Sequence, residues 1–245
     1  MRRWKIAALH ATVGAIAIAA AVFALLRLWY PPALWPLSGA SGLWLLFAAV
    51  ALLPPALTAL VYRSGKRSLR FDIGVILLIQ VAFAAYAFLM LGRIRPVFLV
   101  ATQEHLQLVR ANEIDPQDLA RGRPEDQRLS WTGPRLVGLG VPQGQARAQL
   151  VFSEQANTDL TLQPAYYVRF DDVAMALRKH ARVLDDLTAR TADDRATVEA
   201  ALHDLGKSAA QVRYVPLTGQ RGSAVMLLDA RDGRPLQPLA LQPAS

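Results

Sequence analysis

Long apolar runs and one short basic segment alternate in the first part of the chain. Two apolar runs, residues 43–62 and 73–92, contain no charged residue, and a third apolar run covers residues 6–29. Each run has about 20 residues, enough for a helix to reach across the roughly 30 Å of a bilayer core. The segment 63–70 carries four cations. The pattern predicts transmembrane helices at about 6–29, 43–62 and 73–92.

The remaining residues, 96–245, mix polar and apolar positions as globular domains do. About 150 residues are enough to enclose an apolar core. Periodicity and turn residues predict strands at 96–101, 106–110, 136–141, 212–217 and 225–228, and helices at 115–120, 171–190 and 195–205. Residues 145–155 look weakly helical, and residues 166–168 look extended. The expected fold is a membrane protein with three transmembrane α-helices (1–95), followed by a small α+β extracytoplasmic domain (96–245).

The cations of the first part predict its orientation. The topogenic residues are Arg2, Arg3 and Lys5 before the first run, and Arg63, Lys66, Arg67 and Arg70 after the second. The connection between these two runs, 30–42, carries no charge. Because cytoplasmic loops accumulate Lys and Arg, the amino terminus is expected in the cytoplasm. Three spans would then place the carboxyl domain in the periplasm, with the protein in a bacterial inner membrane.

The net charge of +8 has the same origin. Residues 1–95 contribute +9 and residues 96–245 contribute −1. The basic character therefore belongs to the membrane part, and a nucleic-acid partner is not expected. The chain has no cysteine, which excludes disulfides, thiolate metal sites and a cysteine nucleophile.

Two local features of the apolar runs allow more detailed expectations. Pro54 and Pro55 lie near the middle of the second run and predict a kink, because proline removes a backbone donor and clashes with the preceding turn. The kink is either passive or opens a lateral groove for another helix. Asp72 precedes the third run and is expected to cap its first turn.

No pattern for catalysis or metal binding emerges. Asp-Asp pairs at 171–172, 185–186 and 193–194 are expected to cap helices or face solvent, because hard cations need several converging oxygens. The chain lacks a phosphate-binding glycine loop and a nucleophile elbow. We therefore expect no enzyme activity, no cofactor and no metal.

Several short stretches resemble the type IV pilin accessory family of the TfpX/TfpZ type. They are Arg3-Trp4-Lys5, Trp29-Tyr30-Pro31-Pro32, residues 65–72 and residues 95–100, with weaker matches at 133–135, 159–160 and 164–168. The resemblance implies an inner-membrane, chaperone-like accessory protein that supports pilin stability or pilus assembly without catalysis. Its partners would be a major or minor type IV pilin, membrane lipid and inner-membrane components of pilus assembly. The alternatives are a glycosyltransferase-like membrane enzyme that modifies pilin, and a periplasmic sensor of pilus biogenesis.

Six residues are candidates for contact with such a partner. His10 lies about one turn inside the membrane and could pair with a glutamate in the membrane helix of a pilin. The aromatic residues Trp29, Tyr30, Trp35, Tyr166 and Tyr167 could anchor the pilin head, as exposed aromatics do at interfaces. The simpler alternatives are helix packing for His10, and an interfacial belt or a domain core for the aromatics.

Overall fold

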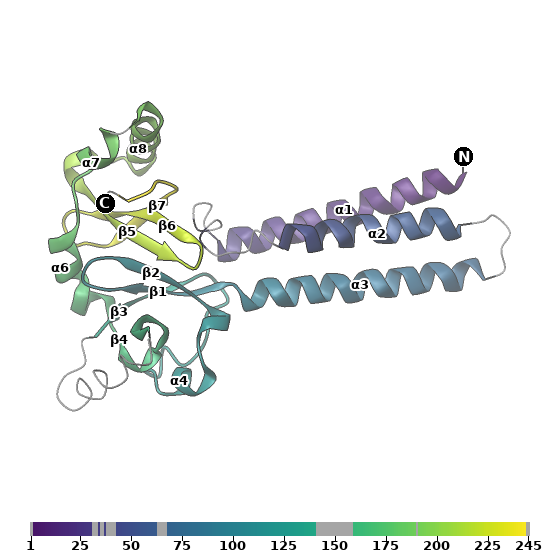
Figure 1. Cartoon of the computed structure of the whole chain (residues 1–245), viewed down its shortest axis with the longest axis horizontal. Helices are drawn as coiled ribbons and strands as arrows, with labels where there is room; N and C mark the ends of the chain where they lie inside the picture. Colours follow the sequence, from purple (N-terminus) through teal and green to yellow (C-terminus); the bar gives the residue numbers. More distant parts are fainter. Residues whose placement is uncertain are drawn as a thin grey trace.

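The computed structural model describes residues 2–30, 34, 37, 43–62, 68–140, 159–189 and 191–243. Three long helices lie alongside one another and extend from one side of a sheet domain, with the amino terminus at the end farthest from the sheet (Figure 1). They are α1 (Arg2–Trp29), α2 (Leu43–Val61) and α3 (Leu69–Arg93). α2 packs against both α1 and α3.

The expectation of three transmembrane helices is wrong. In the part of the chain that the structure describes, two helices are long and apolar enough to cross a membrane, Ala8–Trp29 and Leu69–Arg93. The apolar stretch of α2 is Leu45–Val61, which at about 1.5 Å per residue is shorter than the roughly 30 Å of a bilayer core. In the apolar 18-residue window of each of these two helices only 6% and 11% of the residues are buried, whereas a core helix of a soluble protein is mostly buried. The two helices therefore favour a membrane location.

The start of α3 differs from the expectation, and the prolines of α2 lie inside a continuous helix. α3 begins at Leu69, so Asp72 lies in the first turn of the helix rather than at its cap. In this position the Asp72 carboxylate accepts a hydrogen bond from the Ser68 hydroxyl (3.2 Å). α2 is helical through Pro54 and Pro55. The Thr58 hydroxyl donates to the Pro54 carbonyl one turn earlier in the same helix (2.9 Å).

His10 joins the three helices through a polar network. Its Nδ1 lies 2.9 Å from Thr58 Oγ1 on α2, and its Nε2 lies 2.8 Å from Gln80 Oε1 on α3. Both ring nitrogens are therefore hydrogen-bonded inside the protein. A pairing of His10 with a glutamate of a partner stays a prediction, and it would require the exchange of one of these two bonds.

The domain is built on one sheet of seven described strands in the order β4-β3-β1-β2-β5-β6-β7. The strands are β1 (Pro96–Ala101), β2 (Leu106–Arg110), β3 (Arg135–Leu139), β4 (Tyr167–Val168), β5 (Val212–Gly219), β6 (Gly222–Asp229) and β7 (Pro235–Leu239). β1 pairs with β3 and β2 with β5 in parallel, and the other neighbours are antiparallel. The sheet is therefore mixed.

Helices cover both faces of this sheet. Alternating side chains of β5 point to opposite cores: Val215 and Leu217 pack with α6 (Phe170–His180), whereas Val212 and Tyr214 pack with α7 (Asp185–Thr188) and α8 (Ala192–Leu205). A third core, at β1 and β3, includes Leu119 of the short helix α4 (Pro116–Ala120). Three-residue 3₁₀ helices occur at Ala111–Glu113, Leu160–Leu162, Pro164–Tyr166 and Ala209–Gln211.

The connection between α1 and α2 contributes to the domain core. Leu34 and Leu37 are buried in the same cluster as Leu106 and Leu217. The main chain of Leu37 comes so close to Gly219 that a Cβ at this glycine would lie 2.8 Å from the Leu37 carbonyl oxygen. Although β1 starts at Pro96, the sheet domain therefore includes residues that precede α2.

Most strands expected from the sequence are present, but one helix and one strand differ. The helix expected at 171–190 is broken between α6 and α7, because the Arg182 backbone exchanges two hydrogen bonds with Tyr214 (2.8 and 3.0 Å). β7 was not expected, and it contains Pro235 and Pro238, which are tolerated on an edge strand. The weakly helical segment 145–155 lies outside the described residues.

We predict that His10→Leu destabilises the helices. The substitution leaves Thr58 and Gln80 without their histidine partner, which should lower the free energy of unfolding by about 1 kcal/mol. The apparent melting temperature of the full-length protein in detergent measures this loss. Thr12→Val is the matched control, because the Thr12 hydroxyl donates to Ala8 of its own helix. Equal losses in the two variants would show that the network does not hold the helices together.

Candidate functional site at the junction of the helices and the sheet domain

The ends of α1 and α3 are joined to each other and to the domain by hydrogen bonds of two aromatic side chains. Trp29 Nε1 donates to the main-chain carbonyl of Trp131 (2.7 Å), and the Tyr30 hydroxyl donates to the carbonyl of Ile94 (2.9 Å). Trp29 and Tyr30 are only 4% and 2% exposed. The buried indole and phenol groups have thus found the acceptors that such groups require.

Arg95 completes this junction from the domain side. Its guanidinium donates from Nη1 to the Gly92 carbonyl (2.5 Å) and from Nε to the Ser130 carbonyl (2.9 Å). Its Cζ lies 3.8 Å from the centroid of the Trp131 ring, a distance typical of a cation–π contact. Burial lowers the pKa of Arg95, but a guanidinium keeps its charge in proteins. Arg95 therefore ties the last turn of α3 to the loop that carries Trp131.

An apolar groove of about 600 Å³ lies beside the junction. Leu25 and Trp29 of α1 line it from one side, and Phe88 and Leu89 of α3 line it from the other. Its remaining lining includes Arg93, Arg95 and Trp131. The arrangement places an apolar trough directly next to guanidinium groups.

The aromatic residues that the sequence suggested as exposed anchors differ in their exposure to solvent. Trp29, Tyr30 and Tyr167 are buried, so the expectation of exposure is wrong for these three. Tyr167 packs on Phe98 with ring centroids 5.1 Å apart, its hydroxyl donates to the Thr161 carbonyl, and burial raises its pKa. Tyr166 is partly exposed, and Trp35 lies outside the described residues. The domain-core alternative applies to Tyr167, whereas Trp29 and Tyr30 lie at a junction that the sequence did not suggest.

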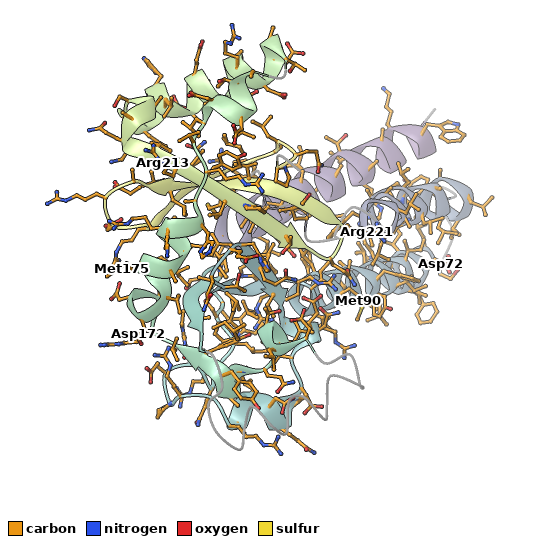
Figure 2. All side chains as sticks on the ribbon, turned by 60° about the vertical axis from the view of Figure 1, so that its left-hand side comes forward. Asp72, Met90, Asp172, Met175, Arg213 and Arg221 are labelled. Carbon is orange, nitrogen blue, oxygen red and sulfur yellow. The ribbon has the colours of Figure 1, made fainter. Side chains whose placement is uncertain are left out.

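The topogenic cations that the structure describes lie at helix starts. Arg2, Arg3 and Lys5 belong to the first turn of α1, and Arg70 belongs to the first turn of α3. Figure 2 shows Asp72, close to Arg70 in the chain, at the end of α3 that is remote from the domain, and Met90 near the domain. Arg63, Lys66 and Arg67 lie outside the described residues.

Trp131 is the junction residue that the sequence did not reveal. It lies in the loop 121–134, which the sequence marks only as charged and turn-rich, and it is 62% exposed. A tryptophan in such a loop, next to Gly133 and Pro134, was the available signal. Its partners Arg95 and Trp29 are 36 and 102 residues away in the chain, and no local pattern links them.

A second, polar cavity lies where the sheet splits between β2 and β5. β5 pairs with β2 only at Leu217 and Thr218. Nearer the amino end of β5, Tyr214 pairs instead with Arg182. The cavity of about 350 Å³ is lined by Glu104, His105, His180, Arg182, Pro216 and Thr218. Burial lowers the pKa of His105, which Glu104 and Asp159 raise to a smaller extent.

Within the described ranges, no group of three or more His, Asp or Glu side chains is placed to hold a metal ion. The Asp pairs belong to separate helices: Asp171 and Asp172 to α6, Asp185 and Asp186 to α7, and Asp193 and Asp194 to α8. Each pair lies in the first turn of its helix, where a negative charge is favourable.

Comparison with known proteins points to pilus assembly. The chain is 21% identical over 232 residues to a protein from Dichelobacter nodosus named fimbrial assembly protein, serogroup E1. The alignment covers 91% of this chain and 89% of the relative, so it takes in both the helices and the domain. No family model matches the chain, and no solved structure matches it. The similarity relates the chain to a pilus-related protein.

We predict that Trp29→Phe weakens the junction. The variant keeps an aromatic ring but loses the donor to the Trp131 carbonyl, which should lower the free energy of unfolding by about 1 kcal/mol. Thermal unfolding of the full-length protein in detergent measures this loss. Trp131→Phe is the matched control, because it keeps the main-chain acceptor and an aromatic ring under Arg95. A loss as large in the control as in Trp29→Phe would contradict the role of the hydrogen bond.

We also predict a pH dependence from His105. Because its pKa is lowered in the folded protein from the usual 6.5, the unfolded chain binds the proton more tightly. Stability from this group is complete above about pH 6.5 and falls as the pH drops below that value, by at most about 1.4 kcal/mol per pH unit. Thermal midpoints between pH 7.5 and 5 should decline less in His105→Gln. His203→Gln, at a side chain that is 91% exposed, should leave the decline unchanged; identical slopes in wild type and His105→Gln would refute the assignment.

Proposed function

We propose that this chain is an inner-membrane accessory protein for a type IV pilin, which supports pilin stability or pilus assembly. The observation that carries the proposal is the similarity to a fimbrial assembly protein along 91% of the chain. The short stretches that resemble the TfpX/TfpZ type support the same role. The two apolar helices favour the membrane location that a pilin partner requires.

The sheet domain is proposed to lie in the periplasm. α1 and α3 both run from the end with the amino terminus towards the domain (Figure 1). Both start with cations, Arg2, Arg3 and Lys5 in α1 and Arg70 in α3. Because cations favour the cytoplasmic side, the opposite end of both helices, with the domain, belongs outside.

The proposed mechanism is simultaneous contact with two parts of one pilin. A pilin that awaits assembly has a membrane helix and a periplasmic head, and this protein offers helices and a domain at the same two levels. The hydrogen bonds of Trp29 and Tyr30 and the contacts of Arg95 hold these two parts together. Two weak contacts on one scaffold gain effective concentration. The role needs no catalysis, cofactor or metal.

We predict that deleting the gene lowers the amount of pilin in the membrane and the number of surface pili, while the mass of the remaining pilin is unchanged. Immunoblotting, electron microscopy and intact-mass measurement of pilin test these three outcomes. Complementation with the wild-type gene is the positive control. Complementation with the Trp29→Phe gene should restore pilin in proportion to the amount of folded variant protein in the membrane.

Two results would overturn the proposal. A changed pilin mass in the deletion strain would favour an enzyme that modifies pilin, and unchanged pilin with unchanged pili would remove the pilus role. A reporter fused to the carboxyl end tests the orientation separately. Activity of a reporter that works only in the cytoplasm would contradict the periplasmic domain.

A further inference from the structure

We infer that the groove between α1 and α3 is the seat of one phospholipid from the leaflet on the domain side. One of its two acyl chains would lie between Leu25 and Leu89, and its phosphate would contact Arg93. This inference does not depend on the identity of a protein partner.

The depth of the groove is the first argument. Leu25 and Trp29 belong to the last two turns of α1, and Phe88, Leu89 and Arg93 belong to the last two turns of α3. The membrane-crossing parts of these helices have 22 and 25 residues, which gives lengths of about 33 and 37 Å against a hydrocarbon core of about 30 Å. The groove therefore lies where acyl chains meet headgroups.

The charge of the rim is the second argument. Arg93 is exposed, and it forms no ion pair with the residues that the structure describes. Arg95 donates to the Gly92 and Ser130 carbonyls and stacks on Trp131, so its guanidinium is already held. The described lining of the groove contains no carboxylate. A phosphate matches the free fork of an arginine, which binds such groups with two parallel hydrogen bonds.

The walls of the groove favour a lipid chain over a helix of another protein. Trp29 closes the floor, since its Cη2 lies 3.9 Å from the position of a Cβ at Gly92. The exposed Trp131 stands beside the mouth, as aromatic residues do at the headgroup level. An apolar helix laid over the groove would bring Arg93 against a surface with no counter-charge, at a cost in desolvation. A phospholipid supplies the apolar chain and the anion in one molecule.

Native mass spectrometry of the full-length protein in mild detergent tests the inference, with palmitoyl-oleoyl-phosphatidylglycerol as the probe. We expect one retained lipid per chain. Arg93→Gln should weaken binding roughly tenfold, because a charge-assisted contact is lost. Ala85→Phe, at a residue that lines the groove, should also reduce binding while leaving the charge intact.

Arg27→Gln is the matched control, because Arg27 is near the end of α1 beside the groove but does not belong to the described lining of the groove. The Arg27 guanidinium lies instead over Phe23, with its Cζ 5.1 Å from the ring centroid. The Arg27→Gln variant should therefore retain the lipid. Equal retention in wild type and Arg93→Gln would overturn the inference. A photo-crosslinker at Leu89 supplies an independent readout: coupling to lipid supports it, whereas coupling to the membrane helix of another protein or to a second copy of this chain overturns it.

Discussion

The hydrogen bonds at the carboxyl end of α3 determine how the long helices and the sheet domain are joined. The last carbonyls of any helix have no partner in the helix itself. Here the Gly92 carbonyl accepts from Arg95 and the Ile94 carbonyl accepts from Tyr30. The helix end is thus satisfied by Arg95, which directly precedes β1, and by Tyr30, which directly follows α1. These two hydrogen bonds link the orientation of α3 to the end of α1 and to the start of the sheet domain.

A related requirement explains how α2 is held although its apolar stretch is short. It packs between two longer helices and contributes Thr58 to the network with His10 and Gln80. The hydroxyl of Thr58 also donates to the Pro54 carbonyl one turn earlier. The same side chain therefore bonds both to its own helix and to His10 of the neighbouring helix.

The features predictable from the sequence were those with a local signal. The Asp115–Pro116 pair marked the start of α4, and Gly206 marked the end of α8 with a left-handed backbone (φ 62°). The absence of charged residues did not reveal the length of α2, because the distance that a helix covers depends on where the helix begins and ends and not on its composition. The break after His180 was also hidden, since Arg182 leaves a helical pattern to pair with Tyr214 in the sheet. The junction was predictable only in part: Trp29 and Tyr30 stood out as aromatics, but the carbonyls that accept their hydrogen bonds, at Trp131 and Ile94, are far away in the chain.

The placement of Leu34 and Leu37 has a consequence for biosynthesis. These side chains fill the core beneath β2 and β5, yet they leave the ribosome before α2. Leu34 and Leu37 are therefore synthesised before every strand of the sheet, and the core to which they belong is complete only after β6 has been made. The helical part and the sheet consequently mature together, and a sheet separated from the chain before α2 would lack part of its apolar core.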